Sequence, residues 1–299
     1  MTEQYWGIDL GGTKIEGVVL GATDAPNPLC RIRVPTEAQK GYEHIVKRIV
    51  GLVQAMRAET ATEPTRVGIG TPGVLDPQNS TMKNSNTTCL IDRPLQHDLE
   101  TALGIPVELA NDANCFALAE ARLGAGRGAK TAFGVILGTG VGGGVVVGQK
   151  ALYGCQGIAG EWGHNLLDPE GPECYCGRRG CVETILSGPF LERFYAERAK
   201  QHRPLAEIAE RHSHGQDPDA DATMERLTTY FGRAIANVIN ILDPDVVVLG
   251  GGVSNIDLLY NEGVRETARH VFNNRLETRI VKNDLGDSAG VFGAAMLVA

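Results

Sequence analysis

Three cysteines within eight positions follow a histidine at a spacing that suits a metal ion. Cys174, Cys176 and Cys181 begin ten residues after His164. Three thiolates and one imidazole match tetrahedral Zn²⁺, and four protein ligands close such a site to substrate. The alternative is a group of buried free thiols, which would not need the two glycines that separate the last two cysteines. The sequence therefore predicts a structural zinc site.

A glycine-rich run near the N-terminus, Asp9-Leu-Gly-Gly-Thr-Lys14, could hold a phosphate. Its glycines permit a tight turn between two strands, and such a turn exposes backbone N–H groups to an anion. The Asp9 carboxylate could bind Mg²⁺, which uses few carboxylates together with substrate phosphates. An ordinary hairpin turn remains the alternative, because the run is neither a P-loop nor a dinucleotide fingerprint. The candidate nucleotide-binding residues here are Asp9, Gly11, Gly12, Thr13 and Lys14.

Two more glycine clusters repeat this pattern. Leu137-Gly-Thr-Gly-Val-Gly-Gly-Gly144 has five glycines between two apolar segments, and Gly250-Gly-Gly252 ends the apolar run Val246–Leu249. Each glycine inside a strand lowers stability, which favours a ligand-binding explanation. A strand-to-helix turn at the second cluster would need one glycine, not three. We expect nucleotide contacts at Gly138, Thr139, Gly140, Gly250, Gly251 and Gly252.

The run Asn111-Asp112-Ala-Asn114 follows an apolar segment and opens an alanine-rich one. One polar residue at this place is explained by helix capping. A second one exceeds that need, and a carboxylate here could accept a proton from a substrate hydroxyl during phosphoryl transfer. Asp112 is therefore a candidate general base, with capping as the alternative.

The apolar pattern predicts alternating strands and helices that would carry these residues. The alternation is expected to fall into two series. The first would include a hairpin over 4–20, and the second would begin with a strand over 131–137 and a loop over 138–144. The polar stretch 202–222 and the segment 35–41 are expected to be surface connectors, although the histidines of the former could also be read as a metal tract. Further expected elements are helices at 42–60, 98–103, 114–123, 186–200 and 223–242, and strands at 66–70, 107–109, 145–147 and 246–249.

Size and charge exclude several classes of protein. The chain has 299 residues, 42% of them hydrophobic, and a net charge of −8. It is long enough for two domains, and the absence of a basic stripe argues against a nucleic-acid partner. No apolar run reaches the roughly 20 residues that span a bilayer, and the N-terminus does not read as a targeting segment. A soluble cytoplasmic protein is expected, and the odd, uneven set of seven cysteines does not suggest disulfides.

In this order, the runs at Asp9–Lys14, Asn111–Asn114, Gly160–His164, Cys174–Glu183 and Gly250–Gly252 resemble the ROK family of sugar kinases and repressors. The resemblance implies an α/β fold of the actin/hexokinase (ribonuclease H-like) type, with two domains and a deep cleft. It also implies ATP and Mg²⁺ as cofactors and a homodimer. The expected domains are 1–117 with 287–299, to which the last helix would return, and 118–286 with the zinc loop.

The same resemblance implies roles for individual residues. Asp112 would take the proton from the sugar's 6-hydroxyl, while Asn111 would hydrogen-bond the sugar. His164 would place one ring nitrogen on zinc and the other on a sugar hydroxyl, so that the metal supports a wall of the sugar site. The remaining sugar contacts that it implies are Gly73, Asn86, Glu161 and Glu183.

The form of these runs most resembles bacterial fructokinases of the family, so fructose is the expected acceptor. N-acetylglucosamine kinase is the near alternative, and glucokinase and N-acetylmannosamine kinase remain open. Residues between Lys83 and Arg93 should shape the pocket around the sugar's C2 substituent. Related fructokinases tend to have Trp where this chain has Cys89.

Proteins of another class must also be weighed. A repressor of the family would carry a helix-turn-helix segment ahead of the Asp9 run, for which we expect no room. A non-catalytic sugar-binding regulator would not need both the glycine runs and Asp112. An actin-like ATPase would share the glycine runs but would not need Glu161, His164 and Glu183 beside a metal.

Overall fold

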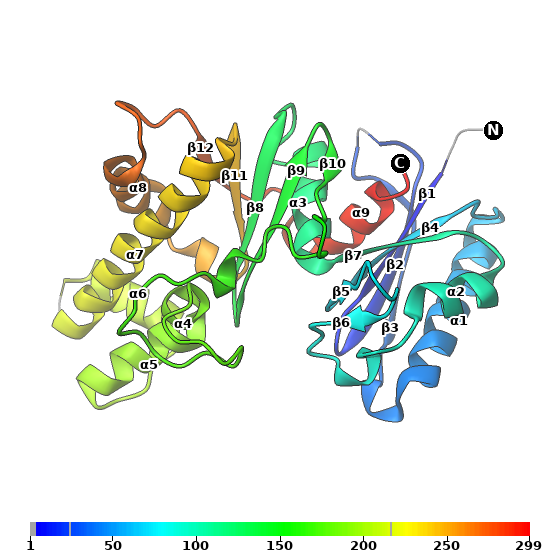
Figure 1. Cartoon of the computed structure of the whole chain (residues 1–299), viewed down its shortest axis with the longest axis horizontal. Helices are drawn as coiled ribbons and strands as arrows, with labels where there is room; N and C mark the ends of the chain where they lie inside the picture. The colour runs from blue at the N-terminus through cyan, green and yellow to red at the C-terminus, as the bar shows by residue number, and fades with distance from the viewer. Residues whose placement is uncertain (1–3, 24, 216) are drawn as a thin grey trace. The chain divides into compact units, whose positions relative to one another are not determined.

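The computed structural model describes residues 4–23, 25–215 and 217–299, and the chain forms two compact units. Figure 1 labels their elements. The first unit contains the chain up to Gly128, Gly144–Gly160 and Asp284–Ala299, and the second contains Ala129–Gly143 and Glu161–Asn283. These units differ from the expected domains chiefly in 118–128 and 144–160. The difference arises because helix α3 (Asp112–Leu123) is continuous and strand β10 (Lys150–Ala151) packs on it.

The first unit is built on a five-stranded sheet of order β3-β2-β1-β4-β7. Strands β1, β2 and β3 are antiparallel, and β1, β4 and β7 are parallel. The chain therefore begins with the predicted hairpin and continues into a crossover arrangement. The strands are β1 (Tyr5–Leu10), β2 (Lys14–Leu20), β3 (Pro28–Pro35), β4 (Val67–Thr71) and β7 (Val107–Asn111), with a small β5 (Val74–Leu75) and β6 (Met82–Lys83) hairpin beside them.

Helices cover the two faces of this sheet, as Figure 1 shows. On one face, α1 (Tyr42–Thr60) and α2 (Leu95–Leu103) bury their apolar stripes against Trp6, Ile8 and Leu10. On the other, α3 packs against α9 (Ala289–Met296), which also lies on β1 and β4. A Cβ atom on Gly68 would stand 1.9 Å from the Ala294 carbonyl oxygen, so only glycine permits this approach. The last helix thus belongs to the first unit.

The second unit contains the parallel strands β8 (Thr131–Leu137), β11 (Val246–Gly250) and β12 (Arg279–Lys282). The long helix α7 (Pro218–Leu242) packs against the helices around it. Its buried residues recur at helical spacing, which explains its amphipathic pattern. The other helices are α4 (Glu183–Leu186), α5 (Gly188–Ala199), α6 (Leu205–Ser213), α8 (Val264–His270), a π-helical turn (Leu259–Gly263) and the short 3-10 helices η3 (Trp162–His164) and η4 (Gly252–Asn255).

Two sequence-based expectations were wrong here. The stretch 202–222 contains helix α6 and the first turn of α7 rather than only a surface connector. The glycines at 142–144 lie inside strand β9 (Val141–Val147), not in a loop. Gly144 is needed there because a Cβ atom would stand 2.5 Å from the carbonyl oxygen of Ala113. Within the described ranges, no helix combines the length and apolarity that crossing a bilayer requires.

Candidate active site

Hydrogen bonds to its backbone fix the turn after β1. The Gly11 N–H donates to the Lys14 carbonyl oxygen at 2.9 Å, and the Thr36 hydroxyl donates to the Gly11 carbonyl oxygen at 2.6 Å. Thr36 is fully buried, whereas Gly12 and Thr13 are exposed. The turn is thus held in place at Gly11, while Gly12 and Thr13 remain accessible to a ligand.

The boundary between β7 and α3 decides which of two polar residues caps the helix. Asn111 is the N-cap, and its Oδ1 accepts the Asn114 N–H at 2.7 Å. Asp112 is the first residue of α3, and its Oδ1 accepts the adjacent Ala113 N–H at 2.8 Å. Because Asn111 supplies the cap, the capping explanation does not account for Asp112. A carboxylate in the first turn is also stabilised by the helix dipole.

Asp9 and Asp112 line one cavity of about 710 Å³ in the first unit. This volume lies within the range of small-molecule sites. The cavity joins the glycine turn to the start of α3 and to the 3-10 helix η2 (Thr88–Leu90). Its lining residues are Asp9, Leu10, Gly11, Gly12, Ala38, Gln39, Pro72, Asn86, Thr87, Thr88, Cys89 and Asp112.

Both carboxylates have a raised pKa. Burial, reinforced by the charge of Asp112, raises the pKa of Asp9 to about 6. The Asp112 side chain remains accessible to solvent, yet the enclosing protein raises its pKa too. Two acids on one cavity form a centre of negative charge that a cation would relieve. Carboxylate oxygens are ligands of Mg²⁺, so the donor set fits magnesium carried with a phosphate substrate.

In the second unit, the glycine loop between β8 and β9 is tied to Glu183. The carboxylate Oε2 of this buried residue accepts the Val141 N–H at 3.0 Å. A Cβ atom on Gly140 would lie 2.7 Å from the same oxygen, so a larger residue at this position would have to displace the Glu183 carboxylate. Gly138 is held as well, since its carbonyl oxygen accepts the Gly188 N–H at 2.9 Å.

The segment that carries His164 packs against the first two residues of β9, Val141 and Gly142. The Trp162 indole N–H donates to the Gly142 carbonyl oxygen at 2.9 Å, and its ring meets Phe133 edge to face. A Cβ atom on Gly163 would stand 2.0 Å from the Val141 carbonyl oxygen. The glycine loop and the histidine therefore share one rigid support.

His164, Cys174, Cys176 and Cys181 converge so that their ligand atoms all lie within 4.8 Å of one another. The Cys176 and Cys181 sulfurs are 3.7 Å apart, and His164 Nδ1 is 3.6 Å from the Cys174 sulfur. Two sulfurs at tetrahedral angles on one zinc ion lie about 3.8 Å apart, given Zn–S bonds of about 2.3 Å. Positive φ angles at the two glycines between Cys176 and Cys181 close the loop. These four residues fit zinc.

A second cavity, of about 1040 Å³, lies wholly within the second unit. One side is formed by the glycine loop at Gly138 and Thr139, and another by η4 and the residues that follow it. The remaining sides come from the start of α5 and from α6. It combines apolar side chains with a few polar ones, as small-molecule sites commonly do. The lining residues are Gly138, Thr139, Gly188, Pro189, Glu192, Pro204, Leu205, Ala206, Ala209, His212, Ser213, Gly252, Val253, Asn255, Ile256, Asp257, Leu258 and Asn261.

Comparison with known proteins shows what this arrangement belongs to. The sequence matches the ROK family over residues 5–299. This chain belongs to the ROK family. It shares 36% identity over 304 residues with the N-acetyl-D-glucosamine kinase of Aliivibrio fischeri, covering 98% of each chain. It shares 37% over 303 residues with that of Vibrio cholerae serotype O1, covering 98% of this chain and 99% of the other.

Two solved structures of the ROK family have the same fold. The ROK hexokinase from Thermus thermophilus has a TM-score of 0.88 at 35% identity, covering 99% of this chain and 97% of that one. The ROK family glucokinase from Streptomyces griseus, solved with glucose and AMPPNP, has a TM-score of 0.78 at 30% identity, covering 99% of each. The predicted α/β fold of the actin/hexokinase type is confirmed.

The structure places fewer than half of the predicted sugar and nucleotide contacts on the two cavities. Among the described residues, Asp9, Gly11, Gly12, Asn86 and Asp112 share the first cavity, and Gly138, Thr139 and Gly252 share the second. Other candidates are held by packing instead. Gly73 is pressed against the Lys83 carbonyl oxygen, and Gly251 against that of Leu137 at positive φ. The candidates outside both linings are Thr13, Lys14, Gly73, Asn111, Gly140, Glu161, His164, Glu183, Gly250 and Gly251.

Some lining residues were missed from the sequence. Gln39 and Ala38 belong to the segment predicted to be a connector, which forms the 3-10 helix η1 (Ala38–Lys40) on the first cavity. Helix α6 was also missed, although it supplies Leu205, Ala206 and Ala209 to the second cavity. The apolar spacing of Leu205, Ile208 and Ala209 was the available signal, but the polar residues around it obscured a short helix.

Proposed function

We propose that this chain is an ATP-dependent sugar kinase that transfers the γ-phosphoryl group of ATP to the 6-hydroxyl of N-acetylglucosamine. The observation that carries the proposal is the Asp112 carboxylate, which lies on the first cavity and is not explained by capping. Family membership and the named activities of relatives at 36–37% identity support the same reaction.

Asp112 would act as the general base. A carboxylate oxygen of Asp112 accepts the proton of the sugar's 6-hydroxyl while the hydroxyl oxygen forms a bond to the γ-phosphorus. The bond from this phosphorus to the leaving ADP oxygen breaks in the same step. The proton then passes to solvent. The raised pKa of Asp112 supports this role, because a stronger base accepts the proton more readily.

Asp9 and the exposed part of the glycine turn would hold the transferring end of the nucleotide. Magnesium bound with ATP would supply positive charge to offset that of the phosphoryl oxygens. The negative cavity around Asp9 is suited to receive such a complex, whereas the phosphates alone would be repelled. The second cavity is our candidate for the nucleoside.

N-acetylglucosamine takes precedence over fructose for two reasons. The relatives described above are named for N-acetylglucosamine, which was the near alternative from the sequence. The first cavity is also lined by the small side chains of Ala38, Thr88 and Cys89, which would leave room for an acetamido group on the sugar. Glucose follows as the next candidate, because a neighbour at 30% identity was solved as a glucokinase with glucose.

Several features belong to the proposal only by family resemblance. They are the sugar contacts of Gly73, Asn111, Glu161, His164 and Glu183, and the homodimer. Zinc is the metal we propose for the cysteine cluster, as support for His164 rather than as a participant in phosphoryl transfer.

An assay of ADP release tests the reaction class. The purified protein with Mg²⁺ and ATP should release ADP only when a hexose is present, and nuclear magnetic resonance should locate the new phosphate on O6. ADP release that does not depend on sugar would instead indicate an ATPase. Binding of sugar without any ADP release would indicate a non-catalytic regulator.

A further inference from the structure

Helix α6 forms a wall of the second cavity. It packs mainly against the neighbouring helices α5 and α7. Leu205, Ala206, Ala209, His212 and Ser213 line the cavity along the helix. The fully buried Ile208 anchors the helix by its apolar contacts. A helix of nine residues is too short to be stable alone, so its position depends on its partners.

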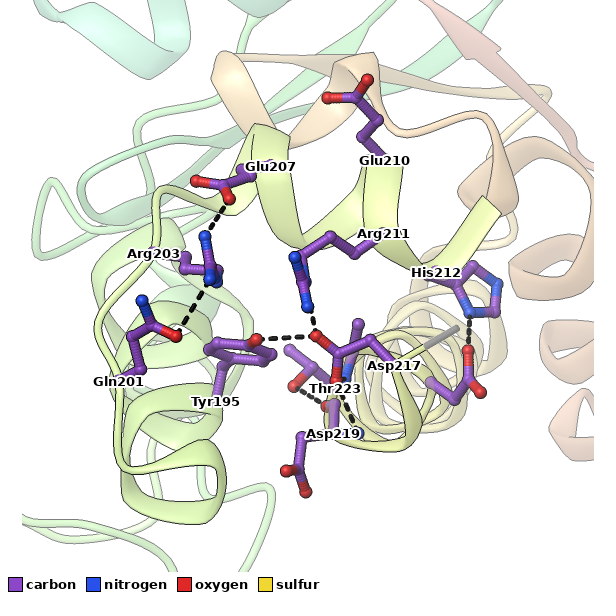
Figure 2. A network of polar contacts seen from close by, with 12 residues as sticks. Tyr195, Gln201, Arg203, Glu207, Glu210, Arg211, His212, Asp217, Asp219 and Thr223 are labelled. Carbon is purple, nitrogen blue, oxygen red and sulfur yellow. Dashed lines mark hydrogen bonds and ion pairs between the residues drawn. The ribbon is translucent and has the colours of Figure 1, made fainter. Parts of the chain in front are cut away.

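One carboxylate, that of Asp217, connects α6 to the two neighbouring helices (Figure 2). The Tyr195 hydroxyl on α5 donates to Asp217 Oδ2 at 2.7 Å, and the Arg211 Nε on α6 donates to the same oxygen at 2.6 Å. The other oxygen, Oδ1, caps α7 by accepting the N–H groups of Asp219 and Ala220. Asp217 is only 7% exposed.

The charge of Asp217 is held by these partners. The Arg211 guanidinium, assisted by the Tyr195 hydroxyl, keeps the pKa of the Asp217 carboxyl well below its usual range. Charge-assisted hydrogen bonds are about twice as strong as neutral ones and define direction more sharply. The three helices therefore meet at a carboxylate that stays ionised across the neutral pH range.

Further polar contacts hold α6 at both ends, as Figure 2 also shows. Near its start, Arg203 pairs with Glu207 and donates to the Gln201 side chain at 2.9 Å. Near its end, His212 Nδ1 lies 2.7 Å from Asp221 Oδ1 on α7. His212 is itself a lining residue, so this contact reaches the cavity directly.

We propose that Asp217 and Arg211 are positioning residues for nucleotide binding, which set the place of α6 at the wall of the second cavity. This inference rests on the proposed function, since it takes the nucleoside to occupy that cavity. Neither residue is among those that line it, so neither is expected to touch the nucleotide. Because these residues would act only by fixing the position of α6, changing them should alter the affinity for nucleotide and no other property of the reaction.

The test is Arg211→Gln, with ADP affinity measured by calorimetry and Michaelis constants measured for both substrates. We expect the Kd for ADP and the KM for ATP to rise roughly three- to tenfold, a range typical of residues that couple to a site without touching it. The KM for sugar and kcat at saturating ATP should stay within about twofold of wild type, since the change is one of uniform binding. Tyr195→Phe, which keeps the ring and removes one donor to Asp217, should shift ADP affinity in the same direction by less.

Arg198→Gln is the matched control. Arg198 on α5 pairs with Asp219 on α7 at 3.1 Å. The variant therefore removes an ion pair between α5 and α7 that does not involve α6. Wild-type ADP affinity in Arg198→Gln supports the proposal even if its melting temperature falls. An equal loss of ADP affinity in this control would overturn it, because the effect would then be one of general stability.

Two other results separate this inference from the proposed function. If the wild-type protein phosphorylates sugar and Arg211→Gln and Tyr195→Phe both bind ADP as tightly as wild type, the positioning role is wrong and the kinase proposal stands. If the wild-type protein binds no ADP, both are wrong.

Discussion

The hydroxyl oxygen of Tyr175 lies 3.1 Å from Nε2 of His164, and the two rings meet edge to face with centroids 5.2 Å apart. The other ring nitrogen, Nδ1, faces the cysteine cluster. Tyr175 is 84% exposed, so it approaches His164 from the solvent side. The nitrogen that family resemblance assigns to a sugar hydroxyl is thus already paired with a tyrosine.

A sugar that contacts His164 Nε2 must displace the Tyr175 hydroxyl. Removing that hydroxyl in Tyr175→Phe should lower the KM for sugar about two- to twelvefold, since a hydrogen bond of this kind contributes about 0.5–1.5 kcal/mol. Zinc content should not change. Tyr230→Phe, which removes a hydroxyl that donates to Asp168 at 2.7 Å, is the control and should leave the KM unaltered. A higher KM in Tyr175→Phe would mean that the tyrosine orients the histidine instead of competing for it.

Asp112→Asn should fold normally and lose kcat by a factor of about 10²–10⁴, the usual contribution of a general base. Steady-state kinetics together with a melting curve check both statements. As a control, Asp98→Asn changes a carboxylate of the same unit that accepts the Tyr42 hydroxyl away from the cavity lining. Near-normal turnover in Asp112→Asn would remove the assigned base.

Activity should fall as the pH is lowered through about 6, where the Asp9 carboxyl takes up a proton and loses its attraction for a cation. Bound magnesium should move this midpoint lower. The profile of kcat/KM against pH, measured at two magnesium concentrations, provides the check. A midpoint that stays fixed while magnesium varies tenfold would contradict a role for Asp9 in cation binding.

The same carboxyl should make an opposite contribution to folding stability. Its folded pKa lies above the ordinary value of 3.8, so the folded state binds more protons than the unfolded chain between about pH 4 and 6. This contribution favours folding at the acidic end and is lost as the pH rises through 6. Asp9→Asn should therefore unfold at higher urea concentration than wild type at pH 7 while losing activity. A lower urea midpoint for this variant would contradict the account.

Metal analysis should find one zinc ion per chain, and Cys176→Ser should release it. Loss of a ligand would loosen the loop and leave His164 free to move, so the KM for sugar should rise more than the KM for ATP. Cys155→Ser, which changes an exposed cysteine outside the cluster, should keep its zinc. Wild-type protein that holds no zinc would refute this assignment.

Local features of the site were predictable from the sequence because they depend on neighbours in the chain. Asn111 caps its own helix through Asn114, and the glycines near Cys181 bend their own loop. Tertiary partners decided the rest. Arg211 and Asp217 read as polar loop residues until α5 and α7 provide their partners. Which glycines meet a ligand and which meet a carbonyl, as Gly144 meets Ala113, also depends on segments far apart in the sequence.

The central claim is most directly tested by kcat/KM for a panel of N-acetylglucosamine, glucose, fructose, mannose and N-acetylmannosamine, because specificity is a ratio of these values. The account predicts the highest value for N-acetylglucosamine, with kcat lowered by a factor of about 10²–10⁴ in Asp112→Asn. A higher kcat/KM for fructose would contradict the assigned acceptor, and a panel without sugar-dependent ADP release would contradict the kinase itself.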